Sequence, residues 1–455
     1  MDRAGLEVQL MFALGRHHNT FEHGIHPPEK KDDTRELPIR QFPFAPVMVI
    51  PLQQHLGAPA RATVREGQEV QRGQLIAEPD GFMSVAMHAP ASGTIQRIDL
   101  APSINGKMVP AVYLKPFPGS SQEIQGGSPC ELADASPEEI LTAIQWAGIV
   151  GLGGAAFPTH VKLKIPEDRQ IDTLIINGVE CEPYLTTDHR VMMEQQADIF
   201  TGIRYLMKAT RAARTVIGIE SNKLDVAESL RQKLPKNEPV SVDVLEVKYP
   251  QGAEKMLITA LLGREVPSGG LPSDVGVVVV NVATTAEIGR LLPTGRGIQE
   301  RVITIGGPAI RKKGNYRIPI GTPLRFALEY AGLDENVSRV FLGGPMMGQA
   351  LPSLDIPITK GTSGFIAFSY AETKPPREYP CIHCGYCVDA CPLFLNPSKL
   401  GLLARNGRHD EMVKDYNLMD CFECGSCSYV CPAHIPLVQY FRGAKTMVRK
   451  QKAAS

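Results

Sequence analysis

Apolar residues in the middle of the chain gather into short runs that alternate with amphipathic stretches. Four runs of strand length occupy residues 171–176, 215–219, 240–247 and 275–282. Between them, residues 190–210, 222–234 and 252–262 have the apolar spacing of helices that bury one face. Ser136-Pro137-Glu-Glu139 is a helix-start signal, with a capping hydroxyl and proline at the first helical position. Residues 136–296 therefore predict an α/β domain with a mostly parallel sheet.

Strand patterns dominate on both sides of this region. Short strands separated by glycine turns are predicted over residues 44–118 and 302–368. In the second stretch, Ile305-Gly-Gly-Pro308 and Leu342-Gly-Gly-Pro345 flank a predicted helix at residues 323–331. The chain up to about residue 42 lacks any period and is rich in turn residues, which predicts an extended arm. We expect a multidomain α/β and β protein divided into residues 1–43, 44–118, 129–296, 297–370 and 371–445, with a Gly/Ser/Gln linker at 119–128.

Length and charge narrow the class of protein. At 455 residues the chain is too long for one average core. Lys plus Arg and Asp plus Glu number 48 each, so the net charge gives no indication of a nucleic-acid partner. The longest apolar run, Val275–Ala283, is far shorter than the ~18 residues that span a bilayer, and Met1–Arg16 lacks the pattern of a secretory signal. We expect an intracellular chain that is soluble or held at a membrane only by partners.

Eight of the ten cysteines lie between Cys381 and Cys431. Such clustering in a long chain indicates metal ligation in a reducing compartment and not a disulfide framework. The eight fall into two copies of one motif, Cys381-Ile-His-Cys384-Gly-Tyr-Cys387-Val-Asp-Ala-Cys391-Pro392 and Cys421-Phe-Glu-Cys424-Gly-Ser-Cys427-Ser-Tyr-Val-Cys431-Pro432. Each copy is the C-x2-C-x2-C-x3-C-P run of bacterial ferredoxins that hold two [4Fe–4S] clusters. Two zinc sites are the alternative, but zinc commonly uses CxxC pairs and does not explain the doubled motif.

The motif also predicts how the cysteines are shared between the clusters. The fourth cysteine of each run ligates the other cluster, so one set is Cys381, Cys384, Cys387 and Cys431, and the other is Cys391, Cys421, Cys424 and Cys427. Gly385 and Gly425 allow the backbone to bend close to the inorganic sulfurs. The residues between the motifs, 393–420, carry helical patterning, with Leu400, Leu402, Leu403, Met412 and Val413 expected to pack beneath the clusters.

A second candidate site lies in the predicted α/β domain. Gly151-Leu-Gly153-Gly154-Ala-Ala-Phe157-Pro158 places three glycines in four residues, so backbone N–H groups can approach a phosphate or a flat ring, and Lys162 can supply a cation. Polar residues follow two predicted strands, in Asn177-Gly-Val-Glu180-Cys-Glu182-Pro and in Asn281-Val-Ala-Thr284. In open α/β sheets, ligands bind at the carboxyl ends of strands. Structural turns are the commoner origin of a lone glycine-rich loop, but this loop together with two polar strand ends favours a binding site.

These motifs resemble those of the flavin- and NADH-binding subunit of respiratory complex I, with its G-R-G-G-A-G-F-P-T-G-x-K, N-A-D-E-x-E-P and N-N-V-E-T sequences. The resemblance implies FMN and NAD(H) binding by Gly151, Gly153, Gly154, Phe157, Lys162, Asn177, Glu180, Glu182, Asn281 and Thr284. The chain departs from the pattern at Leu152, Ala156 and Val179, which replace Arg, Gly and an acidic residue. No side chain need act as acid or base, because the flavin carries the chemistry.

Residues 44–118 resemble the hybrid β-sandwich of biotinyl and lipoyl carriers, but the hairpin Asp80-Gly-Phe-Met-Ser84 has no lysine to modify, which favours a structural or docking role. Residues 297–370 resemble the β-grasp module found beside flavin domains.

The order of the domains, together with an N-terminal arm that contains Gly24-Ile-His-Pro-Pro-Glu-Lys-Lys31, resembles the RnfC family of Rnf complexes from about Gly24 to Ala444. This resemblance implies FMN, NAD(H) and two [4Fe–4S] clusters. It also implies a peripheral protein on the cytoplasmic face of the inner membrane, bound to integral membrane and ferredoxin-like subunits that couple ferredoxin:NAD⁺ electron exchange to ion transport.

Two other functions fit the same sequence. One is a stand-alone flavin reductase, such as a cobalamin reductase with this layout. The other is an electron-wiring and docking protein that has lost its nucleotide, an alternative that the departures at Leu152 and Val179 leave open.

Overall fold

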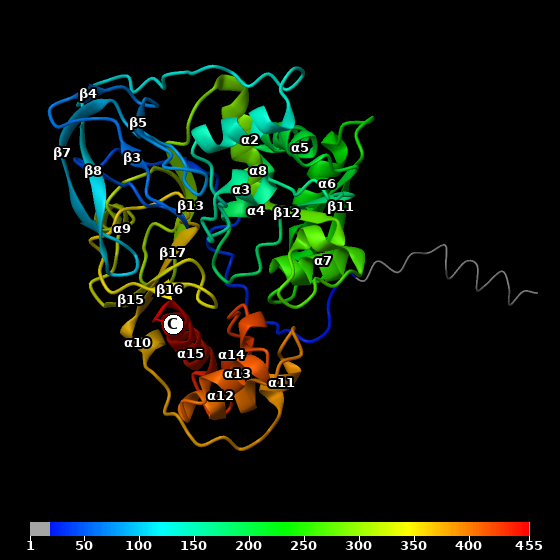
Figure 1. The fold of residues 1–455 in the computed structure, drawn as a ribbon. Helices are drawn as coiled ribbons and strands as arrows, with labels where there is room; N and C mark the ends of the chain where they lie inside the picture. The colour runs from blue at the N-terminus through cyan, green and yellow to red at the C-terminus, as the bar shows by residue number, and fades with distance from the viewer. Residues whose placement is uncertain (1–18, 455) are drawn as a thin grey trace, which may run out of the picture.

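A computed structural model describes residues 19–454 of the chain. Figure 1 shows a β-rich part beside a helical α/β part, with a separate group of helices below both. That lower group is formed by the C-terminal residues, which carry the cysteine motifs. Among residues 19–454, no helix combines the length and apolar character that crossing a bilayer requires.

The α/β unit is built on four parallel strands. Their order is β11 (Val240–Leu245), β10 (Arg214–Glu220), β9 (Thr173–Asn177) and β12 (Val277–Asn281). The helices are α2 (Pro137–Trp146), α3 (Thr159–Leu163), α4 (Thr187–Glu194), α5 (Gln196–Thr210), α6 (Leu224–Lys233), α7 (Glu254–Leu262) and α8 (Val282–Leu291). The predicted parallel α/β sheet is thus confirmed, and the predicted capping box of Ser136 and Glu139 opens α2.

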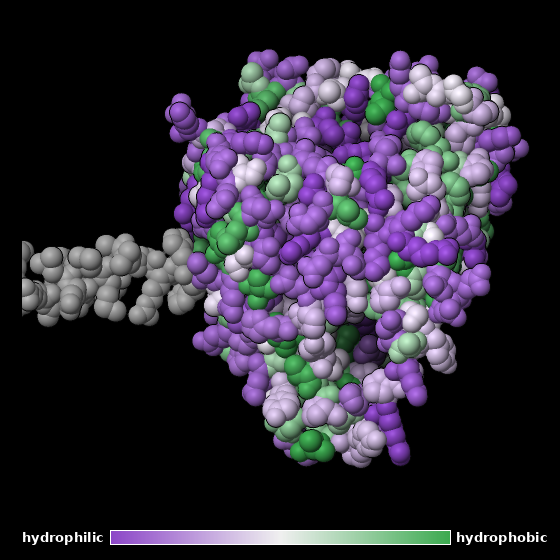
Figure 2. All heavy atoms as spheres, turned by 180° about the vertical axis from the view of Figure 1, so that it is seen from behind, coloured by the Kyte–Doolittle hydropathy of each residue, from purple (hydrophilic) through white to green (hydrophobic). Residues whose placement is uncertain are grey.

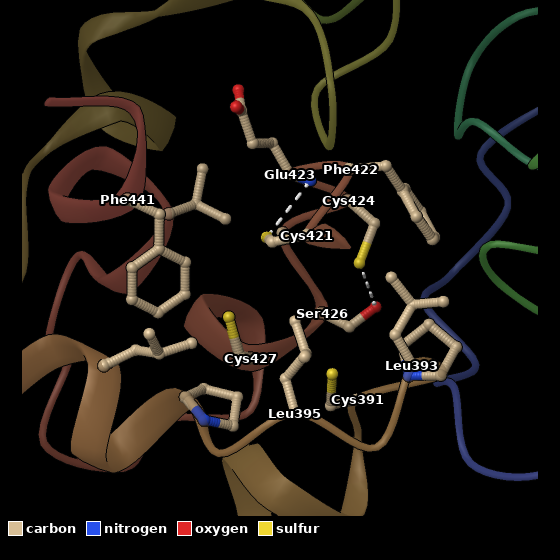
Figure 3. A pocket seen from close by; sticks show the side chains of 15 residues that line it. Cys391, Leu393, Leu395, Cys421, Phe422, Glu423, Cys424, Ser426, Cys427 and Phe441 are labelled. Atoms are coloured by element: carbon tan, nitrogen blue, oxygen red, sulfur yellow. Dashed lines mark hydrogen bonds between the residues drawn. The ribbon is translucent and has the colours of Figure 1, made fainter. Parts of the chain in front are cut away.

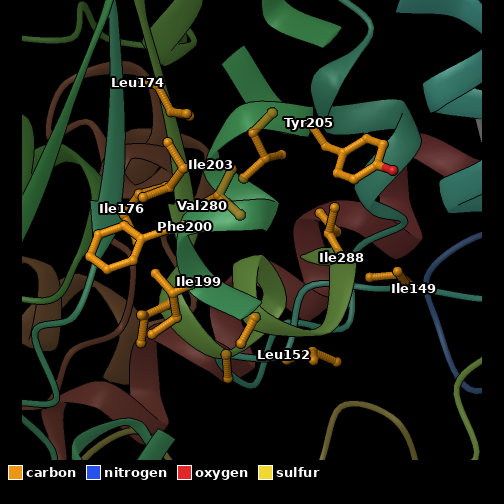
Figure 4. Packing of buried hydrophobic residues seen from close by; sticks show 14 of the residues in the cluster. Ile149, Leu152, Leu174, Ile176, Ile199, Phe200, Ile203, Tyr205, Val280 and Ile288 are labelled. Carbon is orange, nitrogen blue, oxygen red and sulfur yellow. The ribbon is translucent and has the colours of Figure 1, made fainter. Parts of the chain in front are cut away.

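The predicted helix over residues 190–210 is in fact two helices. Gln195 leaves the helical region, with φ −126° and ψ 36°, and separates α4 from α5. The buried face of α5 is part of the hydrophobic core. Ile199 and Ile203 of α5 pack in one cluster with the buried strand residues Leu174 and Val280 (Figure 4), and Leu206 belongs to the same cluster.

The first β unit has two small sheets. One has the order β2 (Met48–Pro51), β8 (Met108–Pro116), β7 (Gly93–Pro102) and β4 (Glu69–Val70), and the other β3 (Arg61–Ala62), β5 (Leu75–Glu78) and β6 (Met87–His88). The hairpin at Asp80–Ser84 rests on the α/β unit. Gln145 of α2 donates to the carbonyls of Gly81 and Ser84, at 3.1 and 2.9 Å. The hairpin is therefore a docking contact between the two units.

The second β unit is a six-stranded mixed sheet. Its order is β1 (Arg40–Gln41), β14 (Gly314–Pro319), β13 (Glu300–Gly306), β17 (Gly364–Ser369), β15 (Val337–Leu342) and β16 (Gln349–Ala350). One helix, α9 (Leu324–Tyr330), packs on it through Leu324, Ala327 and Leu328. The central strands β13 and β17 are parallel, and each pairs with an antiparallel neighbour on its other side.

The C-terminal unit is helical. Two four-residue helices, α11 (Tyr386–Asp389) and α14 (Ser426–Tyr429), follow the two glycines of the cysteine motifs, and α12 (Pro397–Arg405), α13 (His409–Lys414) and α15 (Leu437–Ala454) surround them. Leu400, Leu403 and Met412 are buried in its core, as predicted, and Val413 packs against it. Leu402 is 53% exposed, so its predicted burial is wrong. On α12 the two buried leucines lie at positions 400 and 403, and Leu402 falls on the other side of the helix.

The described part of the arm, from residue 19 on, packs against the rest of the fold. Ile25 forms a bridge with Tyr249, and β1 adds an edge strand to the mixed sheet. Phe21, Lys31 and Phe42 are buried. His17 and His18 lie outside the described residues, whereas the rings of His23 and His26 bond to the carbonyls of Asp389 and Val247. The arm therefore contacts the α/β unit, the mixed sheet and the C-terminal unit.

Candidate redox site

The eight clustered cysteines line two separate pockets. One pocket is lined by Cys391, Cys421, Cys424 and Cys427, and the other by Cys381, Cys384, Cys387 and Cys431. These are the two crossed sets that the motif predicts. Each set therefore takes three cysteines from one motif and the fourth from the other. Figure 3 shows the sulfurs of the first set converging from two chain segments that lie 30 residues or more apart.

Local backbone geometry repeats between the two motifs. Gly385 and Gly425 have φ values of +84° and +88°, a left-handed conformation that glycine adopts without strain. The N–H groups of His383 and Glu423 each donate to the sulfur two residues earlier, Cys381 and Cys421, at 3.4 Å. Such N–H···S bonds stabilise thiolates and tune the potential of a bound cluster. The loop is thus shaped to present sulfur and amide hydrogens to one centre.

The donor set fits an iron–sulfur cluster. Burial raises the pKa of Cys421 to about 11 and also raises the pKa values of Cys391, Cys424 and Cys427. These thiols are neutral at pH 7 by themselves, and ligation to iron releases their protons. Four convergent thiols with few other polar groups around them are the ligand set of a soft metal centre.

The two pockets differ in exposure. The pocket with Cys391 and Cys427 contains the two buried cysteines, whereas Cys381 and Cys384 of the other pocket are exposed.

Hydrophobic side chains also gather at the lower end of the face shown in Figure 2, where the C-terminal unit lies. In that unit Ile382, Tyr386, Phe394, Leu402 and Tyr429 are more than half exposed. We call the pocket of Cys391 the inner pocket and that of Cys381 the outer pocket.

The glycine-rich loop lies against the end of strand β12. The Leu152 N–H donates to the hydroxyl of Thr284 at 2.9 Å, and the Asn281 carboxamide accepts from the N–H groups of Ala283 and Thr284, which starts α8. Gly153 and Gly154 are exposed at the tip of this loop. A Cβ on Gly153 would lie 3.3 Å from Asn281 Nδ2, so a larger residue there requires the Asn281 side chain to shift by a few tenths of an ångström.

The second predicted strand end lies beside the first. Asn177 and Asn281 are register partners at the carboxyl ends of β9 and β12. Asn177 donates to the Gly252 carbonyl at 2.9 Å and accepts from the Val179 N–H, so it orders the turn that follows its strand. The fold therefore brings the glycine-rich loop, Asn177 and Asn281 to one edge of the sheet, as the sequence predicts for a ligand site.

Glu180 belongs to this edge and is buried. One carboxylate oxygen, Oε1, accepts from the Asp188 N–H at 2.9 Å, while Oε2 has no hydrogen-bond partner among the described residues. Asp188, which the sequence reasoning missed, accepts from the Asn281 side chain at 2.7 Å. Burial, together with the charge of Glu180, raises the pKa of Asp188 to about 7. Its first-turn position in α4 gave no signal of this contact.

Three other predicted residues are placed differently. Both carboxylate oxygens of Glu182 accept backbone N–H groups, from Met346 at 3.0 Å and Met347 at 2.7 Å. Lys162 is exposed and pairs with Glu254 at 2.5 Å. Phe157 is half-buried, and its carbonyl accepts from Gly151 to close the loop. The roles of all three in binding a nucleotide or flavin stay predictions.

The polar groups at this edge suit a flavin. Gln251, next to the Gly252 that Asn177 contacts, is fully buried, and both polar atoms of its side chain have no partner among the described residues. Together with Glu180 Oε2, it offers buried hydrogen-bonding capacity that a bound ring system or ribose can satisfy. The exposed tip of the glycine loop leaves backbone N–H groups open to a phosphate.

The turn at Gly252 also connects this edge to the inner pocket. Tyr249, three residues earlier, is 1% exposed and donates its hydroxyl to the Cys424 carbonyl at 2.6 Å. Met346 is one of the two residues whose N–H groups Glu182 accepts, and its carbonyl oxygen would lie 3.1 Å from a Cβ on Gly425. The inner pocket therefore adjoins the turn that Asn177 contacts.

Buried cations from outside the α/β unit hold the loops of this site, and sequence reasoning missed them. Arg301 of β13 donates to the carbonyls of Leu152 and Thr362, at 2.9 and 3.0 Å. Lys360 donates to the carbonyls of Ala86 and Gly148, at 2.6 and 2.8 Å, and so joins three units. Neither residue stands in a motif, and the carbonyls that they hold lie between 61 and 274 positions away in the sequence.

Lys360 makes a pH-dependent contribution to stability. Burial lowers its pKa from 10.5 to about 7. Between these pH values the unfolded chain holds a proton that the folded chain has lost, so the free energy of unfolding rises with pH through this window. We expect the free energy of unfolding of the wild-type chain, measured by urea denaturation, to rise from pH 7 to pH 9. In Lys360→Met this rise should be smaller by a few kcal/mol, about the contribution of one strongly perturbed group. Lys312→Met, at an exposed position, is the control, and equal slopes in both variants would contradict the assignment.

Comparison with known families agrees with this geometry. Family models described as RnfC barrel sandwich hybrid domain, Nuo51 FMN-binding domain and 4Fe-4S dicluster domain match residues 19–116, 144–290 and 379–435. Among solved structures, a chain of an NAD⁺-reducing [NiFe]-hydrogenase in the H₂-reduced state aligns with a TM-score of 0.49 and 19% identity, over 72% of this chain and 68% of that one. The fold and the thiol pockets define an iron–sulfur protein with an FMN-binding type of α/β domain.

Curated relatives narrow this class to one family. One component of the proton-translocating ferredoxin:NAD⁺ oxidoreductase complex of Clostridium ljungdahlii is 42% identical over 94% of this chain and 93% of its own length. Its counterpart in the Na⁺-translocating complex of Acetobacterium woodii is 40% identical over 96% and 98%. A longer relative, from Haemophilus influenzae strain 86-028NP, is 41% identical over 94% of this chain and 64% of its own. The chain belongs to the RnfC family, whose members are subunits of ion-translocating ferredoxin:NAD⁺ oxidoreductase complexes.

Proposed function

We propose that this chain is the electron-relay subunit of an ion-translocating ferredoxin:NAD⁺ oxidoreductase complex, and that it uses NAD(H), FMN and two [4Fe–4S] clusters. One observation carries the proposal. Two crossed sets of four cysteines line separate pockets, and the inner pocket adjoins the turn that contacts Asn177. This arrangement supports a relay that leads from the sheet edge through the C-terminal unit to its surface.

The chemistry that the bound groups supply is hydride exchange at the flavin and one-electron transfer at the clusters. The chain's own residues bind and orient. Gly153 and Gly154 offer backbone N–H groups, and the Gly151 N–H closes the loop on the Phe157 carbonyl. Asn177, Asn281 and Thr284 order the strand ends, Glu180 is a candidate acceptor for ribose or nicotinamide, and Phe157 and Lys162 complete the predicted site. Glu182, whose carboxylate accepts from the Met346 and Met347 N–H groups, is assigned to the contact with the C-terminal unit.

The order of the clusters follows from burial. The inner pocket contacts Tyr249 and is the nearer to the flavin edge, so we assign its cysteines to the cluster that exchanges electrons with the flavin. The outer pocket, with exposed Cys381 and Cys384, is assigned to exchange with a partner. The exposed hydrophobic side chains around it, including Ile382 and Leu402, are suited to that contact.

The partners we propose are the integral membrane and ferredoxin-like subunits of the complex, with this chain peripheral on the cytoplasmic face of the inner membrane. The names of two relatives support attachment to an ion-translocating complex. We also assign the mixed sheet to the β-grasp type, because two hairpins joined through α9 place parallel β13 and β17 at its centre.

NADH titration of the anaerobically purified chain tests this function. We expect loss of flavin absorbance followed by EPR signals of reduced clusters, with roughly eight irons per chain for two [4Fe–4S] clusters. A chain with clusters but no flavin would instead be a wiring and docking protein. Reduction of flavin with transfer to a soluble substrate, in the absence of other subunits, would favour a stand-alone reductase.

A further inference from the structure

The arm contributes one buried cation to the α/β unit that no motif explains. Lys31 is 4% exposed, and its ammonium donates to three backbone carbonyls, those of Glu180 at 2.7 Å, Glu182 at 2.9 Å and Leu185 at 2.5 Å. An ammonium has three donors, so each one is used. All three acceptors belong to the single loop that connects β9 to α4.

That loop carries a strained residue. Tyr184 has a φ of +69°, a left-handed conformation that is costly for a bulky side chain and persists only where surrounding contacts enforce it. Its N–H donates to the Glu29 carbonyl of the arm at 2.8 Å. The arm therefore fixes both the carbonyls of the loop and the N–H of its strained residue.

The loop is also part of the candidate nucleotide and flavin site. It carries Glu180, whose Oε1 accepts from Asp188, and Asp188 in turn accepts from Asn281 at the end of β12. The nearest carboxylate oxygen to the Lys31 ammonium is Glu180 Oε2, at 3.9 Å. A buried ammonium is stable only while enough oxygens surround it, so the carbonyls, the Glu180 carboxylate and the cation depend on one another.

Resting on the function proposed above, we propose that Lys31 is a positioning residue for the redox site. Its ammonium gathers the Glu180–Leu185 loop around one point, and this sets where the Glu180 carboxylate stands relative to the strand ends. Lys31 itself touches neither nucleotide nor flavin. Its effect on them is carried by the loop.

Two measurements test this role on the full chain. The first is hydrogen exchange of backbone amides in the cofactor-free chain, which needs no bound group. We expect Lys31→Gln to speed exchange over residues 180–188 by about tenfold or more, as local opening predicts, and to leave the amides of β10 and α5 unchanged. Lys30→Gln, at the exposed neighbouring position, is the matched control and should not differ from wild type.

The second measurement is NADH oxidation by the loaded chain with a soluble acceptor. We expect Lys31→Gln to raise KM for NADH about tenfold, the equivalent of ~1.4 kcal/mol, with kcat changed much less, because binding geometry is altered and the flavin is not. Lys31→Arg keeps the charge but presents a planar fork that cannot serve three convergent carbonyls, so it should behave like the glutamine variant. If Lys31→Gln does not fold, the same hydrogen-exchange and KM measurements on Lys31→Arg test the role of Lys31.

Two results would overturn the proposal. One is exchange over residues 180–188 equal in Lys31→Gln and Lys30→Gln. The other is faster exchange spread over the whole α/β unit, which indicates general destabilisation. Failure of the wild-type chain to oxidise NADH would defeat the proposed function instead, and the exchange result would still decide the role of Lys31.

Discussion

Replacing Cys387 and Cys391 together is expected to remove nearly all iron from the chain, whereas replacing Cys391 and Cys421 together is expected to remove only half. The first pair lies in one motif but in different pockets, and the second pair lies in different motifs but in the same pocket. With two [4Fe–4S] clusters, the expected iron contents are near zero and roughly four per chain. Alanine at each position and iron analysis of anaerobic preparations make the measurement.

The opposite ranking of these two variants would show that each motif holds its own cluster. Single replacements do not separate the two arrangements, because each removes one ligand from one cluster in either case. Replacement of Cys130 and Cys181, which line neither pocket, is the control and should leave the iron content at the wild-type value.

Replacing Glu182 by alanine is expected to leave reduction of the flavin by NADH intact and to slow the reduction of the clusters. Its carboxylate holds the Met346 and Met347 N–H groups, and the Met346 carbonyl stands next to Gly425 of the inner pocket. Loss of two hydrogen bonds to a charged group, each worth ~1.5–3 kcal/mol, loosens this contact between the flavin edge and the C-terminal unit. Burial raises the pKa of Glu182, so the wild-type contact should weaken at acidic pH sooner than for an exposed carboxylate.

Rapid mixing with NADH, followed by flavin absorbance and freeze-quench EPR, separates the two steps. Glu335→Ala, at an exposed position of the same mixed-sheet unit, is the control. The sequence motif predicts the contrary result, in which Glu182 binds nucleotide. In that case KM for NADH rises, and cluster reduction slows only in proportion to flavin reduction.

Glycine at position 344 shows how such a contact can escape notice in a sequence. The turn Leu342-Gly-Gly-Pro345 resembles the hairpin turn at Ile305–Pro308 and carries no other mark. In the fold, a Cβ on Gly344 would lie 2.1 Å from Glu182 Oε2, so the absent side chain makes room for the carboxylate. The sequence marks the glycine, but only the packing of two units shows what approaches it.

By itself, the sequence determined the parallel α/β unit, the flanking strands and the division of the eight clustered cysteines into two crossed sets of four. These depend on local spacing: apolar period for strands and helices, and the reach of a short loop around a cluster. The tertiary structure alone decided which loops are held by Lys31, Arg301 and Lys360, and that Glu182 contacts Met346 and Met347. It also decided the break at Gln195 and the exposure of Leu402. Each of these depends on which chain segment packs opposite, and the partners are too far apart in sequence for any local pattern to specify them.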